Sequence, residues 1–201
     1  NSGVIIPSPG YLEAARKLCD DVGCLLIFDE IQTGMGRTGK WFAYQHTNMA
    51  PDIMALAKSL GCGLPLGAMV TTEAIGKCFE PGSHGSTFGG NPVACASGLA
   101  AIEVVEENNY LSNAATLGDY FKEKLLELAS KCDVIEAIRQ RGLMIAIGLN
   151  KESNPYRDTC RNQGLMVTVA GGKTLRILPP LNTTTAEVDE ALAILENVFL
   201  N

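Results

Sequence analysis

The stretch CLLIFDE at residues 24–30 decides the fold, because it is a continuous apolar run of strand length that ends in two acidic residues. Such a run is typical of a parallel strand that is buried on both faces. Asp29 and Glu30 would then lie at the carboxyl end of the strand, where open α/β sheets bind their ligands. The stretch therefore predicts a parallel sheet with a functional site at this end.

Segments on both sides of this strand alternate between helix, strand and loop. Apolar residues recur at helical spacing over residues 11–22, and residues 64–72 read as a second buried strand. Residues 82–91 are almost entirely small and polar, which predicts a loop. Asn91 followed by proline predicts the start of a helix that continues to Glu107. This alternation predicts an α/β fold, part of a doubly wound, mostly parallel sheet.

The sequence pattern changes after this helix. We predict an amphipathic helix over residues 114–128, a strand over 143–149 and a short helix over 155–163. A hairpin then pairs residues 165–170 with 174–178 across Gly171 and Gly172, and a second amphipathic helix covers residues 184–198. The last helix begins with a capping box formed by Thr184 and Glu187. We therefore expect residues 1–95 to be the second half of a large domain, and residues 96–201 to be a connecting helix and a small α+β domain.

Composition excludes several classes of partner. The 201 residues are 46% hydrophobic and 19% charged, and the net charge is -6 with scattered basic residues, which argues against binding nucleic acid. No apolar run approaches the roughly 18 residues of a membrane helix, so we expect no membrane association. The seven cysteines include no C-x-x-C, so we expect no disulfide framework, no metal site, and small core residues in a reducing cytoplasm.

The glycine-rich stretch GMGRTGK at residues 34–40 matches the phosphate-binding motif of P-loop ATPases. That motif needs serine or threonine after its lysine, but Trp41 stands there. It should also open a helix and precede the acidic strand, whereas here it follows the strand. An ATPase is therefore the third alternative for the function.

Lys58 and Asp29 are the candidate chemical residues of the large domain. Lys58 follows the apolar run 53–57, where partial desolvation can lower the pKa of an amine and make it a nucleophile, although a lysine at a helix end that exposes its head is also consistent. Asp29 alone could equally cap a helix or form a salt bridge. Together with the loop STFGG at residues 86–90 they fit a pyridoxal phosphate site, which needs an anion for its ring nitrogen and an amine for its aldehyde.

Long motifs then indicate a family. IFDEIQTGMGRTG at 27–39, AKSLGCGLPLGA at 57–68 and HGSTFGGNP at 84–92 resemble class III (fold type I) pyridoxal phosphate-dependent aminotransferases. The resemblance covers essentially the whole chain. RQRGLM at 139–144 and LRILPPL at 175–181 are similar to the acetylornithine aminotransferase subgroup.

The resemblance implies a role for each residue of the strand end. Lys58 would form the Schiff base with pyridoxal 5'-phosphate and carry the proton between substrate and cofactor. Asp29 would pair with the pyridinium nitrogen, Ile31 would pack on the ring, and Gln32 would hydrogen-bond its 3-oxygen. The resemblance also places Glu30 among the residues that bind the cofactor.

The resemblance also places residues outside this strand end. Thr87 would reach the cofactor phosphate of the neighbouring subunit, with Ser86 beside it near the substrate. Arg176 would hold the substrate α-carboxylate, a task that suits a planar guanidinium. Leu175 and Ile177 flank Arg176, so strand alternation directs it to the opposite face.

The implied reaction is transfer of an amino group from N-acetylornithine to 2-oxoglutarate in arginine biosynthesis, by a cytoplasmic homodimer with sites at the subunit interface. Ornithine, 4-aminobutyrate or succinyldiaminopimelate are alternative donors, and a non-catalytic, partner-binding fragment is the alternative from another class. The chain starts in apolar sequence without methionine, so we expect it to be the C-terminal half of the family's chain. We expect this half to be inactive alone, because the family's phosphate loop and ring-stacking aromatic residue belong to the first half.

Overall fold

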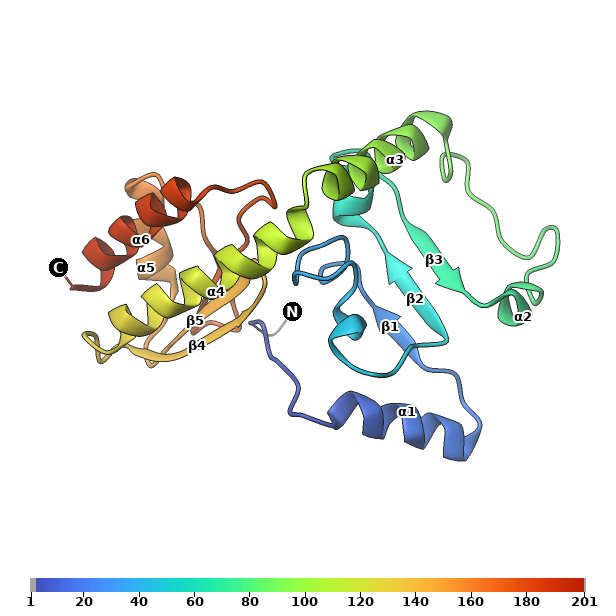
Figure 1. Ribbon diagram of the computed structural model, residues 1–201, viewed down its shortest axis with the longest axis horizontal. Coiled ribbons are helices and arrows are strands. Elements are labelled where there is room, and N and C mark those ends of the chain that lie inside the picture. The colour runs from blue at the N-terminus through green and yellow to red at the C-terminus, as the bar shows by residue number, and fades with distance from the viewer. Residues whose placement is uncertain (1–2, 201) are drawn as a thin grey trace. The chain divides into compact units, whose positions relative to one another are not determined.

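The computed structural model describes residues 3–200, which form two compact units (Figure 1). The N-terminal unit contains residues 7–36 and 40–109, and the C-terminal unit contains residues 3–6, 37–39 and 110–200. The chain thus divides between Asn109 and Tyr110. The boundary after residue 95 stays a prediction about the domains of the whole protein.

The N-terminal unit is built on a three-stranded sheet in the order β1-β2-β3. Its elements are α1 (Tyr11–Val22), β1 (Ile27–Asp29), η1 (Ala43–His46), β2 (Ile53–Leu56), η2 (Lys58–Gly61), β3 (Ala68–Thr71), α2 (Glu73–Gly76) and α3 (Pro92–Glu107). Strands β1 and β2 are parallel, with Asp29 opposite Ala55, and β2 and β3 are antiparallel. The sheet is therefore mixed, and the parallel pair is the one that the acidic strand end belongs to.

The helix boundaries of this unit follow the sequence signals. Helix α1 covers the predicted residues 11–22 and ends at Gly23, whose φ of 71° is the left-handed conformation that favours glycine. Helix α3 begins after Asn91, whose side chain accepts a hydrogen bond from the N–H of Ala94. Both predicted helices are confirmed.

Within this chain the apolar strand residues are partly exposed, whereas their sequence pattern is typical of strands covered on both faces. Leu25 and Ile27 are 54% and 61% exposed, and Met69 and Val70 of β3 are each 47% exposed. The physical reason is that α1 buries none of its own residues, so it covers no large part of the sheet. The core of this unit is instead a small cluster around the carboxyl end of β2, formed by Met35, Met54, Leu56 and Leu60 with Trp41, Phe42, Tyr44, Leu66 and Ile102.

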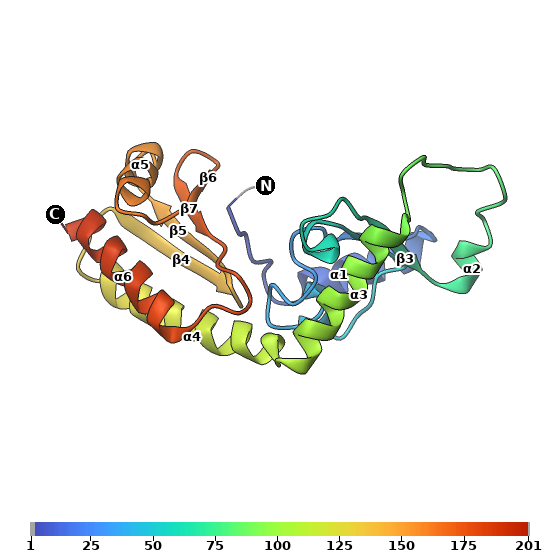
Figure 2. The same cartoon turned by 90° about the horizontal axis from the view of Figure 1, so that it is seen from above.

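The C-terminal unit has an antiparallel sheet in the order β4-β5-β7-β6. Its elements are α4 (Tyr110–Ala129), β4 (Ile135–Arg141), β5 (Met144–Leu149), α5 (Asn154–Asn162), β6 (Thr168–Ala170), β7 (Thr174–Ile177) and α6 (Thr185–Leu200). Helices α4 and α6 lie side by side (Figures 1 and 2). The unit therefore has the α+β character that the sequence predicts.

This unit holds the larger core. The predicted apolar stripe of α4 is buried, from Ala114 to Leu128, and all six residues of β5 are buried. Helix α6 is capped as predicted, because Thr184 and Glu187 exchange hydrogen bonds between side chain and backbone N–H. Strand β4 was not predicted, since its sequence IEAIRQR has no strict alternation.

Residues 37–39 belong to the C-terminal unit through close backbone packing. The Leu143 N–H donates to the Arg37 carbonyl at 3.0 Å, and the Arg37 guanidinium donates to the carbonyls of Leu143, at 3.2 Å, and Pro179. A Cβ atom on Gly142 would lie 2.4 Å from the backbone carbon of Thr38. The glycine-rich stretch therefore anchors the chain in the C-terminal unit and opens no helix of the P-loop kind.

Two kinds of functional feature do not occur in the part of the chain that the structure describes. Among residues 3–200, no helix is both long and apolar enough to cross a membrane. Within the same range, no three His, Cys, Asp or Glu side chains gather in a way that could hold a metal ion. All seven cysteines are free, but Cys24, Cys62 and Cys78 are exposed, so the expectation that the cysteines are core residues is wrong for these three.

Candidate functional site

The carboxyl end of β1 places Asp29 and Glu30 on opposite sides of the chain. Asp29 is exposed, and its Oδ1 accepts a hydrogen bond from the N–H of Ile31 at 3.0 Å, which closes a tight turn. The N–H of Glu30 donates to the carbonyl of Ala55 on β2 at 3.0 Å. The turn therefore presents the Asp29 carboxylate at the strand end while the sheet holds its backbone.

Glu30 is 3% exposed and acts as an anchor for the loop that follows. Its Oε1 accepts the N–H of Tyr44 at 2.9 Å, and its Oε2 accepts the hydroxyl of Thr33. Its carbonyl accepts the N–H of Gly34 at 2.9 Å. Both carboxylate oxygens thus have partners within the N-terminal unit, and these contacts fix the loop that carries Ile31 and Gln32.

Lys58 begins the turn η2 directly after β2, the strand parallel to β1. Its side chain is exposed, and its φ is 52°. A left-handed φ is uncommon for a residue with a side chain, and such backbone strain is concentrated at functional sites. Asp29 therefore ends β1 and Lys58 follows β2, so both lie at the carboxyl ends of adjacent parallel strands, where ligands bind in open α/β folds.

Helix α3 holds the Lys58 turn in place. The hydroxyl of Ser97 donates to the carbonyl of Gly61 at 2.9 Å. Gly98 lies so close that a Cβ atom there would come within 3.1 Å of the Leu60 carbonyl oxygen. Neither Ser97 nor Gly98 was predicted as a site residue, although the run of small residues in α3 is a signal for close helix packing.

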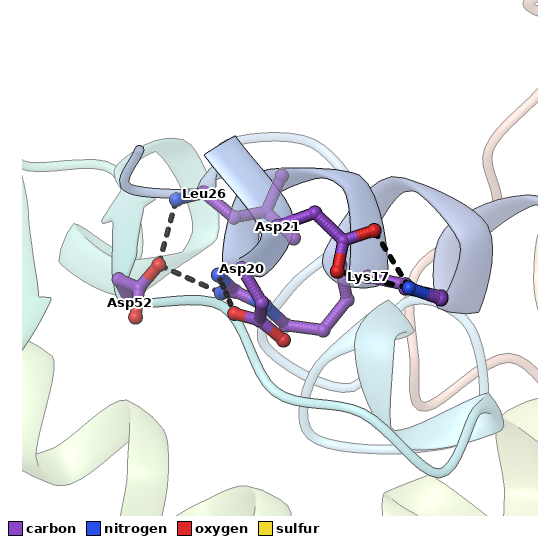
Figure 3. Close-up of polar contacts among 6 residues, drawn as sticks. Lys17, Asp20, Asp21, Leu26 and Asp52 are labelled. Carbon is purple, nitrogen blue, oxygen red and sulfur yellow. Dashed lines mark hydrogen bonds and ion pairs between the residues drawn. The ribbon is translucent and has the colours of Figure 1, made fainter. Parts of the chain in front are cut away.

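A second polar cluster lies at the opposite end of β2 (Figure 3). Asp52 Oδ2 accepts the N–H of Leu26 at 2.7 Å and forms an ion pair with Arg16 at 2.7 Å, and Arg16 also pairs with Asp20 at 2.6 Å. The Leu26 N–H and then Arg16 lower the pKa of the Asp52 carboxyl. The cluster ties α1 to the start of the strand that ends in Asp29.

The loop between α2 and α3 carries Ser86 and Thr87, and residues 81–90 are all exposed. The Ser86 hydroxyl accepts the N–H of Gly89 at 2.9 Å, which closes a local turn. In both views of the ribbon this loop stands away from the three strands of its unit (Figures 1 and 2). The hydrogen bond of Ser86 is thus local to this exposed loop, which also carries Thr87.

Arg176 lies in β7 of the C-terminal unit, where it is half-buried. Leu175 and Ile177 are 0% and 4% exposed, which confirms the predicted alternation of the strand. The Nε of Arg176 donates to the hydroxyl of Thr168 on β6 at 3.2 Å. This contact holds the stem of the guanidinium on the face opposite the core.

The predicted residues therefore fall into three groups. The first group lies at one edge of the N-terminal sheet and consists of Asp29, Glu30, Ile31, Gln32 and Lys58. Their donor set, an accessible carboxylate and an accessible amine on neighbouring strand ends, fits the ring nitrogen and the aldehyde of pyridoxal phosphate. The other two groups are the loop with Ser86 and Thr87 and the strand with Arg176.

The C-terminal unit also contains a groove. It has a volume of about 270 Å³ between α4 and α6 and is bordered by Tyr120, Lys124, Glu127, Leu128, Lys131, Asp189, Leu192, Ala193 and Glu196. The hydrogen bond to Asp189 raises the pKa of the Tyr120 hydroxyl. None of the predicted site residues borders this groove.

The sequence resembles known aminotransferases over almost its full length. Acetylornithine aminotransferase of Aquifex aeolicus is 42% identical over 197 residues, which are 98% of this chain and 50% of that protein. Ornithine aminotransferase 2 of Staphylococcus aureus is 42% identical over 199 residues, which are also 98% of this chain and 50% of that protein. The chain spans about half the length of the curated relatives it matches.

Solved structures agree with the sequence relatives. The ornithine aminotransferase from Toxoplasma gondii has a TM-score of 0.94 and 37% identity, and the match covers 98% of this chain and 48% of that chain. The acetylornithine aminotransferase from Elizabethkingia anophelis has a TM-score of 0.91 and 35% identity, with coverage of 97% and 52%. The predicted α/β fold class is confirmed.

The family described as aminotransferase class-III matches residues 1–199. The match includes the strand end with Asp29 and the turn with Lys58, the two positions that the fold brings to one edge of a sheet. The resemblance found in the sequence motifs is thereby confirmed. The chain belongs to the class III aminotransferases, a family that depends on pyridoxal 5'-phosphate.

Proposed function

We propose that the protein transfers an amino group from N-acetylornithine to 2-oxoglutarate, as a step in arginine biosynthesis. The observation that carries the proposal is the placement of Asp29 and Lys58 at the carboxyl ends of adjacent parallel strands. The names of the relatives from Aquifex aeolicus and Elizabethkingia anophelis support N-acetylornithine as the donor.

Pyridoxal phosphate supplies an aldehyde that joins amines and a ring that withdraws electrons from the bond being broken. Asp29 would hold a proton on the ring nitrogen by placing a negative charge beside it. Lys58 would hold the cofactor through its ε-amine and would carry the proton that leaves the substrate α-carbon. Ile31 would pack on the ring and Gln32 would bind its 3-oxygen.

The remaining site residues bind and orient the two ends of the reactants. Arg176 binds the α-carboxylate that both the amino donor and the 2-oxo acid carry, so one guanidinium serves both half-reactions. Thr87 binds the cofactor phosphate of a neighbouring subunit, with Ser86 beside it. Glu30 contributes to the cofactor set by anchoring the loop that carries Ile31 and Gln32.

The Thr87 role requires a homodimer with sites at the subunit interface, which we place in the cytoplasm. The exposed position of residues 81–90 supports this arrangement, since the loop is open to a second subunit. The 201-residue chain alone is inactive in this proposal, because it spans only half the length of its relatives. A folded but non-catalytic half that binds a partner is the alternative.

Ornithine is the second candidate donor. Ornithine aminotransferase 2 of Staphylococcus aureus is as similar to this chain as the acetylornithine enzyme of Aquifex aeolicus, at 42% identity. The two donors differ in the acetyl group on the α-nitrogen, so a comparison of rates separates them. We expect kcat/KM for N-acetylornithine to exceed that for ornithine by at least about tenfold, or ~1.4 kcal/mol in transition-state binding.

The attachment of the cofactor tests the central residue. Borohydride reduction of the full-length protein loaded with pyridoxal phosphate should fix the cofactor to the peptide containing Lys58. Lys58→Ala should abolish this covalent label and transamination, whereas Lys40→Ala, which removes an exposed lysine from the glycine-rich loop, should preserve both. Covalent label that persists in Lys58→Ala would place the attachment at another lysine and overturn the assignment.

A further inference from the structure

Two cysteines meet at the end of α1, outside the site described above. Helix α1 ends at Gly23, whose φ is 71°, and the N–H of Cys24 then donates to the carbonyl of Cys19 at 2.9 Å. The N–H of Gly23 donates to the carbonyl of Asp20 at 3.3 Å. These two bonds define a Schellman motif, which turns the chain back over the last turn of its helix.

In a Schellman motif the side chains at the two ends of the hydrogen bond that spans six residues, here from residue 24 to residue 19, frequently contact one another. Here both of these residues are cysteines. Cys24 is exposed and Cys19 is partly buried, so a small reagent in solution reaches Cys24 first. Interaction with the Cys24 thiol, followed by burial, raises the pKa of the Cys19 thiol, in agreement with adjacent thiols.

The other cysteines lack this arrangement. Cys132 and Cys160 are buried, and burial raises the pKa of the Cys160 thiol to about 11, which keeps it protonated and unreactive. Cys62 and Cys78 are exposed but stand in separate turns, after η2 and after α2, and Cys95 is partly buried within α3. Cys19 and Cys24 are therefore the two thiols whose approach is fixed by a backbone motif within six consecutive residues.

We propose that Cys19 and Cys24 form a modification site that closes into an intrachain disulfide by exchange with a small-molecule disulfide such as oxidised glutathione. The Cys24 thiolate attacks one sulfur of oxidised glutathione, forms a mixed disulfide and releases the first glutathione. Cys19 then loses its proton to solvent, attacks the Cys24 sulfur and releases the second glutathione. The two protein thiols are oxidised by two electrons and the glutathione disulfide is reduced by two, so the step balances.

The proposed disulfide would fasten the end of α1 to the segment that leads into β1. Leu26, two residues after Cys24, is already held by Asp52 at 2.7 Å, and Asp29 follows three residues later. The backbone motif already turns Cys24 back over the last turn of α1, which carries Cys19.

The test is equilibration of the full-length protein in buffers of reduced and oxidised glutathione, followed by acid quenching, alkylation with N-ethylmaleimide and peptide mass spectrometry. We expect the peptide containing Cys19 and Cys24 to become two hydrogen atoms lighter and to take up neither glutathione nor maleimide. In Cys24→Ser, Cys19 should carry glutathione instead, and it should require a ratio of oxidised to reduced glutathione at least about tenfold higher. Cys78→Ser, which removes an exposed thiol elsewhere, should leave the pair unchanged.

Two results would overturn the proposal. One is a wild-type protein in which Cys19 and Cys24 each carry glutathione or maleimide, and are not joined to each other, at ratios of oxidised to reduced glutathione that modify Cys62 and Cys78. The other is oxidation that appears only as a covalent dimer on a non-reducing gel, because Cys24 would then pair between chains. A circular dichroism spectrum of Cys24→Ser that matches the wild type ensures that the comparison is made between folded proteins.

Discussion

Replacement of Glu30 tests whether the loop beside Asp29 is held by this buried carboxylate. Glu30→Ala removes the acceptor of the Tyr44 N–H, bonded at 2.9 Å, and of the Thr33 hydroxyl. Leaving a buried or partly buried donor without an acceptor costs about 1–3 kcal/mol, so the two donors together cost about 2–6 kcal/mol. Total stabilities of domains are about 5–15 kcal/mol, and the loss is therefore large.

Glu30→Gln is the matched control. The amide oxygen can still accept the Tyr44 N–H, and the amide nitrogen can donate to the Thr33 hydroxyl, which also accepts. Only the extra strength of a charged acceptor is lost, so we expect a cost below about 1.5 kcal/mol. The ordering of the two variants tests the geometry separately from the charge.

The assay is urea unfolding of the full-length protein, combined with titration of pyridoxal phosphate by its absorbance. The midpoint should fall strongly in Glu30→Ala and slightly in Glu30→Gln, and cofactor affinity should follow the same order, because Ile31 and Gln32 lie in the loop that Glu30 anchors. A Glu30→Ala protein within about 1 kcal/mol of the wild type would refute the reasoning. Equal damage in both variants would show that the charge, and not the hydrogen-bond geometry, is what the loop needs.

Three further predictions concern other parts of the molecule. Gly118→Ala should gain about 1 kcal/mol of helix propensity, but it should lose more by overpacking because its Cβ atom would lie 2.2 Å from the Gly142 carbonyl oxygen. We therefore expect the melting temperature of this variant to fall below that of the wild type. The pKa of the Asp52 carboxyl is lowered in the folded protein, so its contribution to stability is present above the ordinary carboxyl pKa of about 4. This contribution is lost as the pH falls through the lower native pKa. The difference in urea midpoint between the wild type and Asp52→Asn should therefore shrink below about pH 4. Arg176→Lys should weaken binding of both the amino donor and the 2-oxo acid by about tenfold with an unchanged cofactor spectrum, and weakening for one substrate only would assign Arg176 to a distal carboxylate.

Local signals in the sequence predicted much of the fold. Helix α1 has the bounds that its periodicity and Gly23 indicate, and the cap at Asn91 and the box at Thr184 are present. The hairpin across Gly171 and Gly172 pairs as predicted. These features depend on residues close together in the chain, which is why a single sequence contains enough information for them.

Burial and backbone strain could not be predicted in the same way. The run at residues 24–28 is apolar enough for a strand covered on both faces, yet Ile27 is 61% exposed, because burial depends on what packs against a strand. The φ of 52° at Lys58 could not be predicted from the sequence either, because a left-handed conformation at a residue with a side chain is imposed by the surrounding structure. Strand β4 was missed because its polar residues break the alternation.

The motifs that identify the family have two different physical origins. Asp29 and Lys58 are exposed and carry groups suited to chemistry, and a substitution there need not disturb packing. In contrast, Arg37 is largely buried, and burial lowers the pKa of its guanidinium while that group donates to two backbone carbonyls of its own unit. Gly142 leaves room for no Cβ atom beside Thr38. The family pattern therefore combines two kinds of residue. Some carry reactive groups, and others join the glycine-rich loop to the C-terminal sheet. The sequence alone does not distinguish the two kinds, whereas the structure does.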